Sequence, residues 1–150
     1  MFKQRLIDIY LQDWKAEVNL TTDGRLYKQF NKKFIFESYL KINNQSLRVA
    51  ISKIRLSSHL FFIERGRWSQ NKVDRRDRKC QYCNCIEDEF HVLLFCPMFN
   101  NAREGLLPDF LTKEKNMVNF LKFINSKNKE IQKKLGLLCH KVQKEYKQLL

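Results

Sequence analysis

Apolar residues recur at helical spacing along most of the chain, which predicts a mainly α-helical protein. Residues 1–20 are expected to form an amphipathic helix that packs on the rest of the chain. A turn is expected at 21–24, and one or two short helices at 25–41, where aromatic and basic side chains interleave. The stripe of the first helix consists of Phe2, Leu6, Ile9, Tyr10, Trp14 and Val18, with Trp14 expected as a core anchor rather than a base-stacking residue.

The middle of the chain predicts another helix, capped by Asn44 or Ser46 and ending at 57–59. Its buried stripe is Leu47, Ala50, Ile51 and Ile54. His59 follows it with no cysteine nearby, so we expect a hydrogen-bonded structural histidine rather than a metal ligand. Residues 60–63 are apolar and are expected to be buried.

Three further helices are predicted towards the C-terminal end. The first spans about 97–107 and stops before Pro108. Thr112 is expected to cap the second, and Ser126 the third. The second buries Met117, Phe120, Leu121 and Ile124, and the third buries Ile131, Leu135, Leu138, Val142, Tyr146 and Leu149 opposite a lysine-rich face.

Composition narrows the class of protein. Only 4 glycines and 2 prolines occur among 150 residues, which favours helices over a turn-rich β fold. The formal net charge of +13 suits a polyanion, most often a nucleic acid, although a solubilising basic surface is the alternative. No segment reaches membrane-spanning length, and no membrane partner is expected. The odd number of cysteines, 5, without a signal peptide predicts reduced thiols in an intracellular, nuclear or cytoplasmic, unsecreted protein.

The most informative stretch is residues 80–96, which read CQYCNCIEDEFHVLLFC. Cys80 and Cys83 are separated by two residues, and His91 and Cys96 follow. Three thiolates and one imidazole form a typical ligand set for a structural Zn²⁺ ion, with a short turn bringing the first pair together. The alternative is a cluster of buried cysteines without a metal.

The second ligand pair requires a bend in the chain. Residues 86–95 predict a short helix with acids in its first turn. His91 and Cys96 would lie about 140° apart on an ideal helix. Pro97 pushes Cys96 out of helical geometry, so we place His91 on the helix and Cys96 at its frayed end, turned back to the metal. Cys85 is an alternative ligand to Cys80 or Cys83, but its spacing from Cys83 is too tight, and we expect a bystander thiol.

A basic loop is predicted between the apolar residues 60–63 and the first cysteine pair. Residues 65–79 hold seven cations and two acids, a net charge of +5, with little apolar content. Arginine forks suit phosphate oxygens, and exposed aromatic rings stack on unpaired bases. The alternative is a mobile linker with Trp68 tucked into the core. The expected nucleic-acid contacts are Arg65, Arg67, Trp68, Lys72, Arg75, Arg76, Arg78, Lys79 and Tyr82.

Catalytic signatures are missing from the sequence. It has no glycine-rich phosphate loop, no nucleophile elbow and no His-Glu-x-x-His motif, so we expect no enzyme activity. The acids at 87–89 are assigned to the helix dipole and to orienting His91. A zinc ion with four protein ligands would leave no open position for a catalytic water.

Residues 46–103 resemble the C-terminal zinc-binding region of reverse transcriptases from non-LTR retrotransposons. The resemblance rests on LRVAISKIRLSSHLFFIERGRW, RKCQYC, IEDEFHVLLFCPMF and a following AR, and more weakly on the upstream DWKAEV and FNKKFIFESYL. It implies the ligands Cys80, Cys83, His91 and Cys96, and a non-catalytic tail of a mobile-element polyprotein. Such a tail would position template RNA or target DNA for the polymerase part of its parent polyprotein.

The sequence therefore predicts one helical domain organised around a zinc knuckle. Helices at 1–42 precede a zinc-binding core at 44–103, and a helical pair follows at 109–150. The expected function is nucleic-acid binding, to RNA or DNA. The alternatives are a zinc-scaffolded protein-interaction module and a non-functional remnant of a mobile element.

Overall fold

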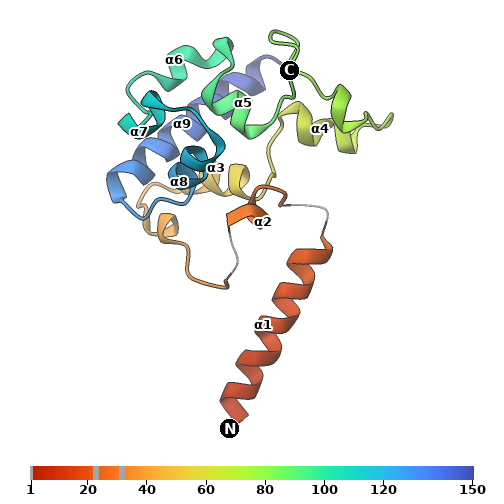
Figure 1. Cartoon of the computed structure of the whole chain (residues 1–150), viewed down its shortest axis with the longest axis vertical. Helices are drawn as coiled ribbons and strands as arrows, with labels where there is room; N and C mark the ends of the chain where they lie inside the picture. The colour runs from red at the N-terminus through yellow and green to blue at the C-terminus, as the bar shows by residue number, and fades with distance from the viewer. Residues whose placement is uncertain (1, 22–23, 31–32) are drawn as a thin grey trace.

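Helices joined by short loops make up the computed structural model, which describes residues 2–21, 24–30 and 33–150 (Figure 1). Over these residues no β-strand forms, so the mainly α prediction is confirmed. The helices in chain order are α1 (Phe2–Leu20), α2 (Tyr27–Phe30), η1 (Ser38–Lys41), α3 (Gln45–Arg55), α4 (Phe62–Trp68), η2 (Arg75–Asp77), α5 (Glu89–Leu94), η3 (Pro97–Phe99), α6 (Asn100–Arg103), α7 (Asp109–Lys113), α8 (Met117–Ile124) and α9 (Lys129–Gln148).

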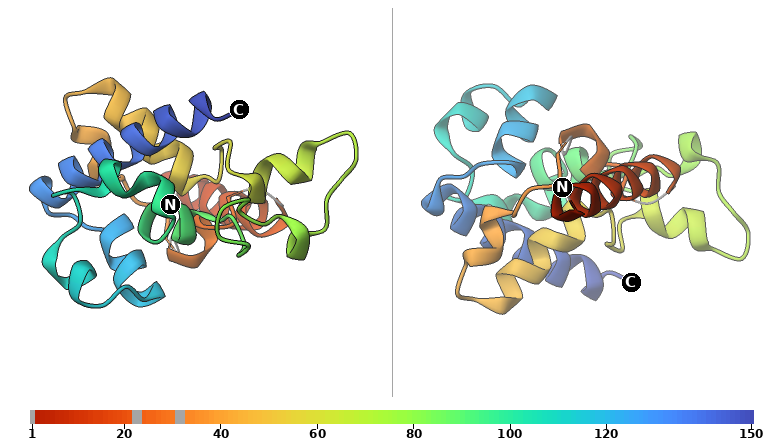
Figure 2. Two further views of the ribbon diagram at one scale, coloured as in Figure 1. Left: turned by 90° about the horizontal axis from the view of Figure 1, so that it is seen from above. Right: turned by 90° about the horizontal axis from the view of Figure 1, so that it is seen from below.

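The centre of the molecule is the pairing of α3 with α9, which lie along each other (Figures 1 and 2). α3 begins after Asn44, whose side chain accepts a hydrogen bond from the Leu47 amide at 3.3 Å, as the sequence predicted. The predicted stripe of α3 is buried, and so is most of the stripe of α9. η1 packs on α3, α6 and α8 pack on α9, and α5 brings the cysteine-rich stretch against α9.

Two predicted caps are wrong. Asn116, not Thr112, caps α8, and its side chain accepts from the Asn119 amide at 2.8 Å. Thr112 lies inside α7. Asn128, not Ser126, caps α9 by accepting from two amides of its first turn. Both asparagines have extended backbone directly before the first helical residue, as an N-cap requires.

The helix predicted over 97–107 is shorter than expected. A 3₁₀ turn, η3, leads into α6, which ends at Arg103. Gly105 follows with φ of +67°, a left-handed conformation that glycine adopts without strain and that ends the helix.

α1 forms as predicted, but its expected packing is wrong. The helix projects away from the other helices (Figure 1), and none of its residues is buried. Trp14 is half-buried and meets Phe34 edge-on at 5.5 Å between ring centroids, so it does not anchor the core. Phe2 and Leu6 are exposed. Helical spacing predicted the helix and its stripe, but it carries no information about what covers that stripe.

Parts of two predictions lie outside the described residues. The turn predicted at 21–24 includes 22–23, and the segment predicted at 25–41 includes 31–32. In the described parts of that segment, α2 and η1 form. Among the described helices, none is both long enough and apolar enough to cross a lipid bilayer.

Candidate metal centre and its basic arm

The side chains of Cys80, Cys83, His91 and Cys96 converge at one point. Their candidate ligand atoms all lie within 4.8 Å of one another, which is compatible with one metal ion. Cys80 Sγ and Cys96 Sγ are 3.8 Å apart. Two sulfurs at about 2.3 Å from a tetrahedral zinc ion are separated by about 3.8 Å, so this pair already has the spacing of two ligands.

A tight hairpin presents the first two sulfurs. We name residues 78–87 the cysteine hairpin. The Cys80 amide donates to the Cys85 carbonyl at 2.8 Å, and the Asn84 amide donates back to the Cys80 carbonyl at 2.8 Å. Lys79 and Ile86 form an antiparallel bridge. Asn84 closes the turn with φ of +53°, a conformation that asparagine tolerates better than most residues.

α5 and the residue before Pro97 present the other two ligands. α5 carries His91, and the backbone of Cys96 leaves helical geometry with φ of −57° and ψ of 120°. The expected bend before Pro97 is therefore present. The Asp88 side chain caps α5 by accepting from the His91 amide at 2.9 Å. This cap fixes the backbone that carries the imidazole.

Burial shifts the pKa values of Cys83, His91 and Cys96. Burial raises the pKa of the Cys96 thiol to about 12, and the nearby Cys80 also contributes to raising it. Burial, together with Cys80, raises the pKa of Cys83 in the same way. For His91, burial lowers the pKa, which favours the neutral imidazole that metal ligation requires. Closely spaced thiolates at this position therefore need a cation for stabilisation.

Cys85 lies beside the group of four. Its sulfur is 3.1 Å from His91 Nδ1, and the residue is exposed, so it touches a candidate ligand from the solvent side. The Cys85 carbonyl accepts a hydrogen bond from the Cys80 amide, which holds Cys85 in the hairpin next to the first candidate ligand.

The acids at 87–89 match one of their two predicted roles in part, because Asp88 and Glu89 lie at the N-terminal end of α5, where acids favour the helix dipole. Of the three, only Asp88 bonds His91, and its carboxylate accepts a hydrogen bond from the His91 backbone amide. Glu87 is buried and accepts from the Phe62 amide at 2.6 Å and from the Tyr146 hydroxyl. Glu89 is buried and accepts from His59, Ser57 and Arg25. The prediction that these acids orient the imidazole is therefore wrong for both glutamates, which join α5 to distant parts of the chain.

Arg103 is a supporting residue that the sequence analysis did not identify. It is buried, and its guanidinium donates to the carbonyls of Cys96 and Val92 and to the Asn100 side chain. These bonds hold the loop that carries the fourth ligand. The available signal was an arginine close behind Cys96 and Pro97, next to asparagines that offer acceptors for a guanidinium.

The predicted basic loop is partly helical. Residues 62–68 form α4, and the loop starts only at Ser69. We name residues 62–79 the basic arm, which projects sideways from the helical core (Figures 1 and 2). Of residues 60–63, Phe61 and Ile63 are buried, whereas Leu60 is exposed and Phe62 half-buried. Only one face of α4, which includes Ile63, Glu64 and Gly66, is buried.

The cations of the basic arm fall into two groups. Arg78 points inward and donates to the carbonyls of Val73 and Ile63 at 2.9 and 2.8 Å, so it braces the arm instead of being free for phosphate. Arg67 pairs with the buried Glu64 at 2.8 Å. The exposed cations are Arg65, Lys72, Arg75, Arg76 and Lys79, of which Arg65 also lies over the Phe62 ring and Arg76 also bonds Asp74.

The two aromatic residues predicted to stack on bases both face solvent. Trp68 is 69% exposed and Tyr82 is 53% exposed, so Trp68 is not tucked into the core. Arg67 lies over the Trp68 ring at 5.1 Å. Trp68 lies on the arm and Tyr82 on the cysteine hairpin.

Comparisons with protein-family models, with characterised proteins and with solved structures find no match to this chain. The resemblance to the tail of a reverse transcriptase therefore rests on the motifs quoted above and stays a prediction.

Proposed function

We propose that this chain is a zinc-stabilised module that binds nucleic acid through its basic arm. The observation that carries the proposal is the convergence of three thiols and one imidazole directly beside an arm rich in exposed cations. The zinc ion would have Cys80, Cys83, His91 and Cys96 as ligands, in a closed, non-catalytic coordination sphere. In the parent protein implied by the resemblance, the module would position template or target for a polymerase.

The role of the metal follows from the chain segments that it would join. The cysteine hairpin and α5 meet at the four ligands, and the basic arm leads directly into the hairpin. Zinc bound there would fix the direction of the arm relative to the core. Three thiolates and a neutral imidazole around Zn²⁺ would carry a net charge of −1, and the buried Arg103, which bonds the Cys96 carbonyl, would help to stabilise it.

The test is a salt titration of binding to a fluorescent oligonucleotide. If about five phosphates are neutralised, the logarithm of affinity falls with the logarithm of salt concentration at a slope near −4. Changing Lys72, Arg75 and Arg76 together to Gln is expected to weaken binding at least about tenfold and to reduce that slope by about 2. Arg78 is left unchanged because it braces the arm.

The matched control changes Lys127, Lys129 and Lys133 to Gln. These lysines are exposed, and their replacement removes the same amount of positive charge as the arm variant. They lie at the start of α9, on the opposite side of the molecule from the arm (Figure 1). Equal weakening by both triple variants would show that net charge, and not the arm, drives binding. Wild-type affinity that does not respond to salt would refute the nucleic-acid proposal.

Protein docking is the second candidate, favoured by the uncovered apolar stripe of α1. Phe2, Leu6 and Ile9 are 78%, 52% and 46% exposed. Contiguous exposed apolar surface often marks an interaction site. Unchanged nucleic-acid binding by the arm variant, together with lost partner binding in a Leu6→Lys variant, would favour docking.

A further inference from the structure

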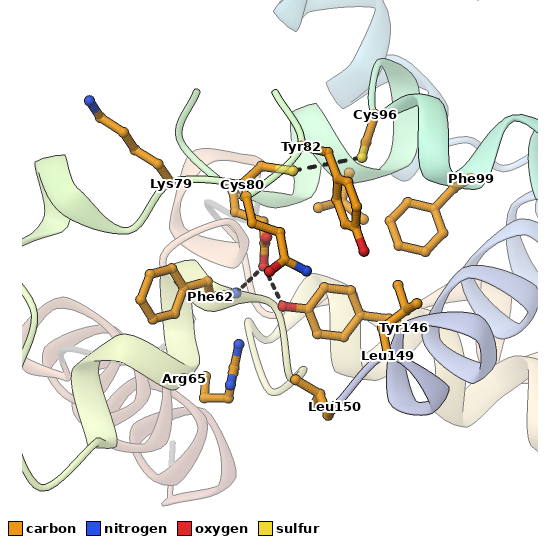
Figure 3. Close-up of a pocket in the computed structure, with 13 residues that line it drawn as sticks. Phe62, Arg65, Lys79, Cys80, Tyr82, Cys96, Phe99, Tyr146, Leu149 and Leu150 are labelled. Atoms are coloured by element: carbon orange, nitrogen blue, oxygen red, sulfur yellow. Dashed lines mark hydrogen bonds between the residues drawn. The ribbon is translucent and has the colours of Figure 1, made fainter. Parts of the chain in front are cut away.

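A pocket of about 410 Å³ opens between the cysteine hairpin, the start of the basic arm and the end of α9 (Figure 3). Cys80 and Cys96, two of the candidate metal ligands, form part of its wall. The volume is at the small end of the range of roughly 300–1,000 Å³ seen for small-molecule sites. It is large enough for one planar ring system.

Aromatic residues line the pocket: Phe62, Tyr82, Phe99 and Tyr146. Phe99 and Tyr146 are buried and form its floor, and their rings stack at 6.2 Å between centroids. Tyr82 reaches from the hairpin into the pocket (Figure 3), although its side chain remains 53% exposed. A planar ring that enters the pocket would therefore meet the Tyr82 ring face without displacing core residues.

The charges at the pocket favour an anionic ligand. Arg65 directs its guanidinium into the pocket and lies over the Phe62 ring at 5.4 Å (Figure 3). Lys79 lines the rim and points its ammonium group outward. Glu87 is the one acidic side chain among the described residues that line the pocket. Its carboxylate already accepts hydrogen bonds from the Phe62 amide and the Tyr146 hydroxyl.

We propose that this pocket takes one unstacked nucleobase of a single-stranded nucleic acid, with Tyr82 as the stacking partner. Arg65 and Lys79 would contact the phosphates on either side of that base. Aromatic stacking combined with a basic track is the usual way to bind single strands without reading sequence. The inference rests on the proposed function and adds to it the strand type and the position of the base.

The experiment compares two end-labelled strands of about eight nucleotides, the order of a single-strand site size. One carries pyrimidine bases, and the other is abasic at every position with the same phosphates. Both are made with ribose and with deoxyribose, since either sugar presents the same stacking chemistry. Wild-type protein, purified without chelator, is expected to bind the base-bearing strand about tenfold more tightly, the size of one base–aromatic contact.

Three variants locate the contact. Tyr82→Leu is expected to bind both strands equally, at the wild-type affinity for the abasic strand. Tyr82→Phe keeps the ring and is expected to keep the tenfold preference. Tyr10→Leu, the matched control at an equally exposed tyrosine of α1, outside the pocket, is expected to keep it too. Because Tyr82 is exposed, these changes are expected to leave the fold intact.

Failure of this inference is distinguishable from failure of the proposed function. If wild type binds both strands equally, with the salt dependence described above, the arm binds phosphates and no base enters the pocket. If Tyr82→Leu keeps the preference, the base lies elsewhere, and the pocket assignment is overturned. If neither strand binds at all, the proposed function itself fails.

Discussion

At the residue scale, Glu89 connects three parts of the chain. The buried carboxylate accepts from His59 Nε2 at 2.9 Å and from the Ser57 hydroxyl at 3.1 Å, and it pairs with Arg25. Burial alone would raise its pKa, but the hydrogen bond and charge of His59, together with Arg25, lower the pKa to about 2. Residues near α2, α3 and α5 are thereby tied together behind the metal centre.

This network predicts a specific loss of stability in acid. A carboxylate with a depressed pKa stabilises the fold above its unfolded pKa of about 4.3, and this stability is lost as the pH falls towards the folded value. Glu89→Gln is expected to lower the free energy of unfolding by roughly 3 kcal/mol at pH 6, with the deficit shrinking between about pH 4.5 and pH 2.

Urea unfolding of the two proteins across this range measures the deficit. Any metal is lost by both proteins on acidification, so the difference between them reports Glu89. A deficit that is the same at pH 3 and pH 6 would mean that the carboxylate charge plays no part.

Individual side chains show which structural roles could be predicted from the sequence and which could not. Asn44 as a cap and His59 as a hydrogen-bonded structural histidine were predictable from local rules. The inward orientation of Arg78 was not predictable. In the sequence, a cation in a charged run looks the same whether it faces solvent or donates to carbonyls. The roles of Glu87 and Glu89 depend on partners 25 or more residues away, which local spacing does not reveal.

At the element scale, the fold depends on the close approach of α3 and α9. Gly136 is buried in α9, and a Cβ atom built there would lie 2.9 Å from Leu47 Cβ. Real Cβ atoms do not approach so closely, so a side chain here would push the helices apart.

Gly136→Ala is therefore expected to destabilise the protein by about 1–3 kcal/mol, despite the higher helix propensity of alanine. Lys133→Ala, at an exposed position of the same helix, is the control and is expected to change stability by less than about 0.5 kcal/mol. Thermal or urea unfolding measures both. A Gly136→Ala protein more stable than wild type would show that the helices are farther apart than described.

Helical spacing predicted the existence of the main helices better than their surroundings. α3 and α9 each carry a clear apolar stripe, and most residues of both stripes are buried in the core. The same kind of stripe in α1 remains exposed, because periodicity identifies an apolar face without identifying its partner. α4 was missed because its first residues looked like the end of an apolar run and its charged residues looked like the start of the basic loop.

At the scale of the whole molecule, the candidate metal centre joins the helical core to the basic arm. The cysteine spacing predicted which four side chains converge, and Pro97 predicted the bend that returns Cys96 to the other three. The pocket beside it was not predictable, because its lining comes from the arm, the hairpin, α5 and α9. Residues so far apart meet only through the packing of the complete fold.

The most direct test of this account is the metal content of protein purified without chelator. The account predicts one zinc ion per chain, measured by elemental analysis and native mass spectrometry. Cys83→Ser is expected to lose the metal and much of the thermal stability, whereas Cys139→Ser, at a buried cysteine outside the group of four, keeps the metal. A folded wild-type protein without bound metal, whose stability does not change when zinc is added, would contradict the account.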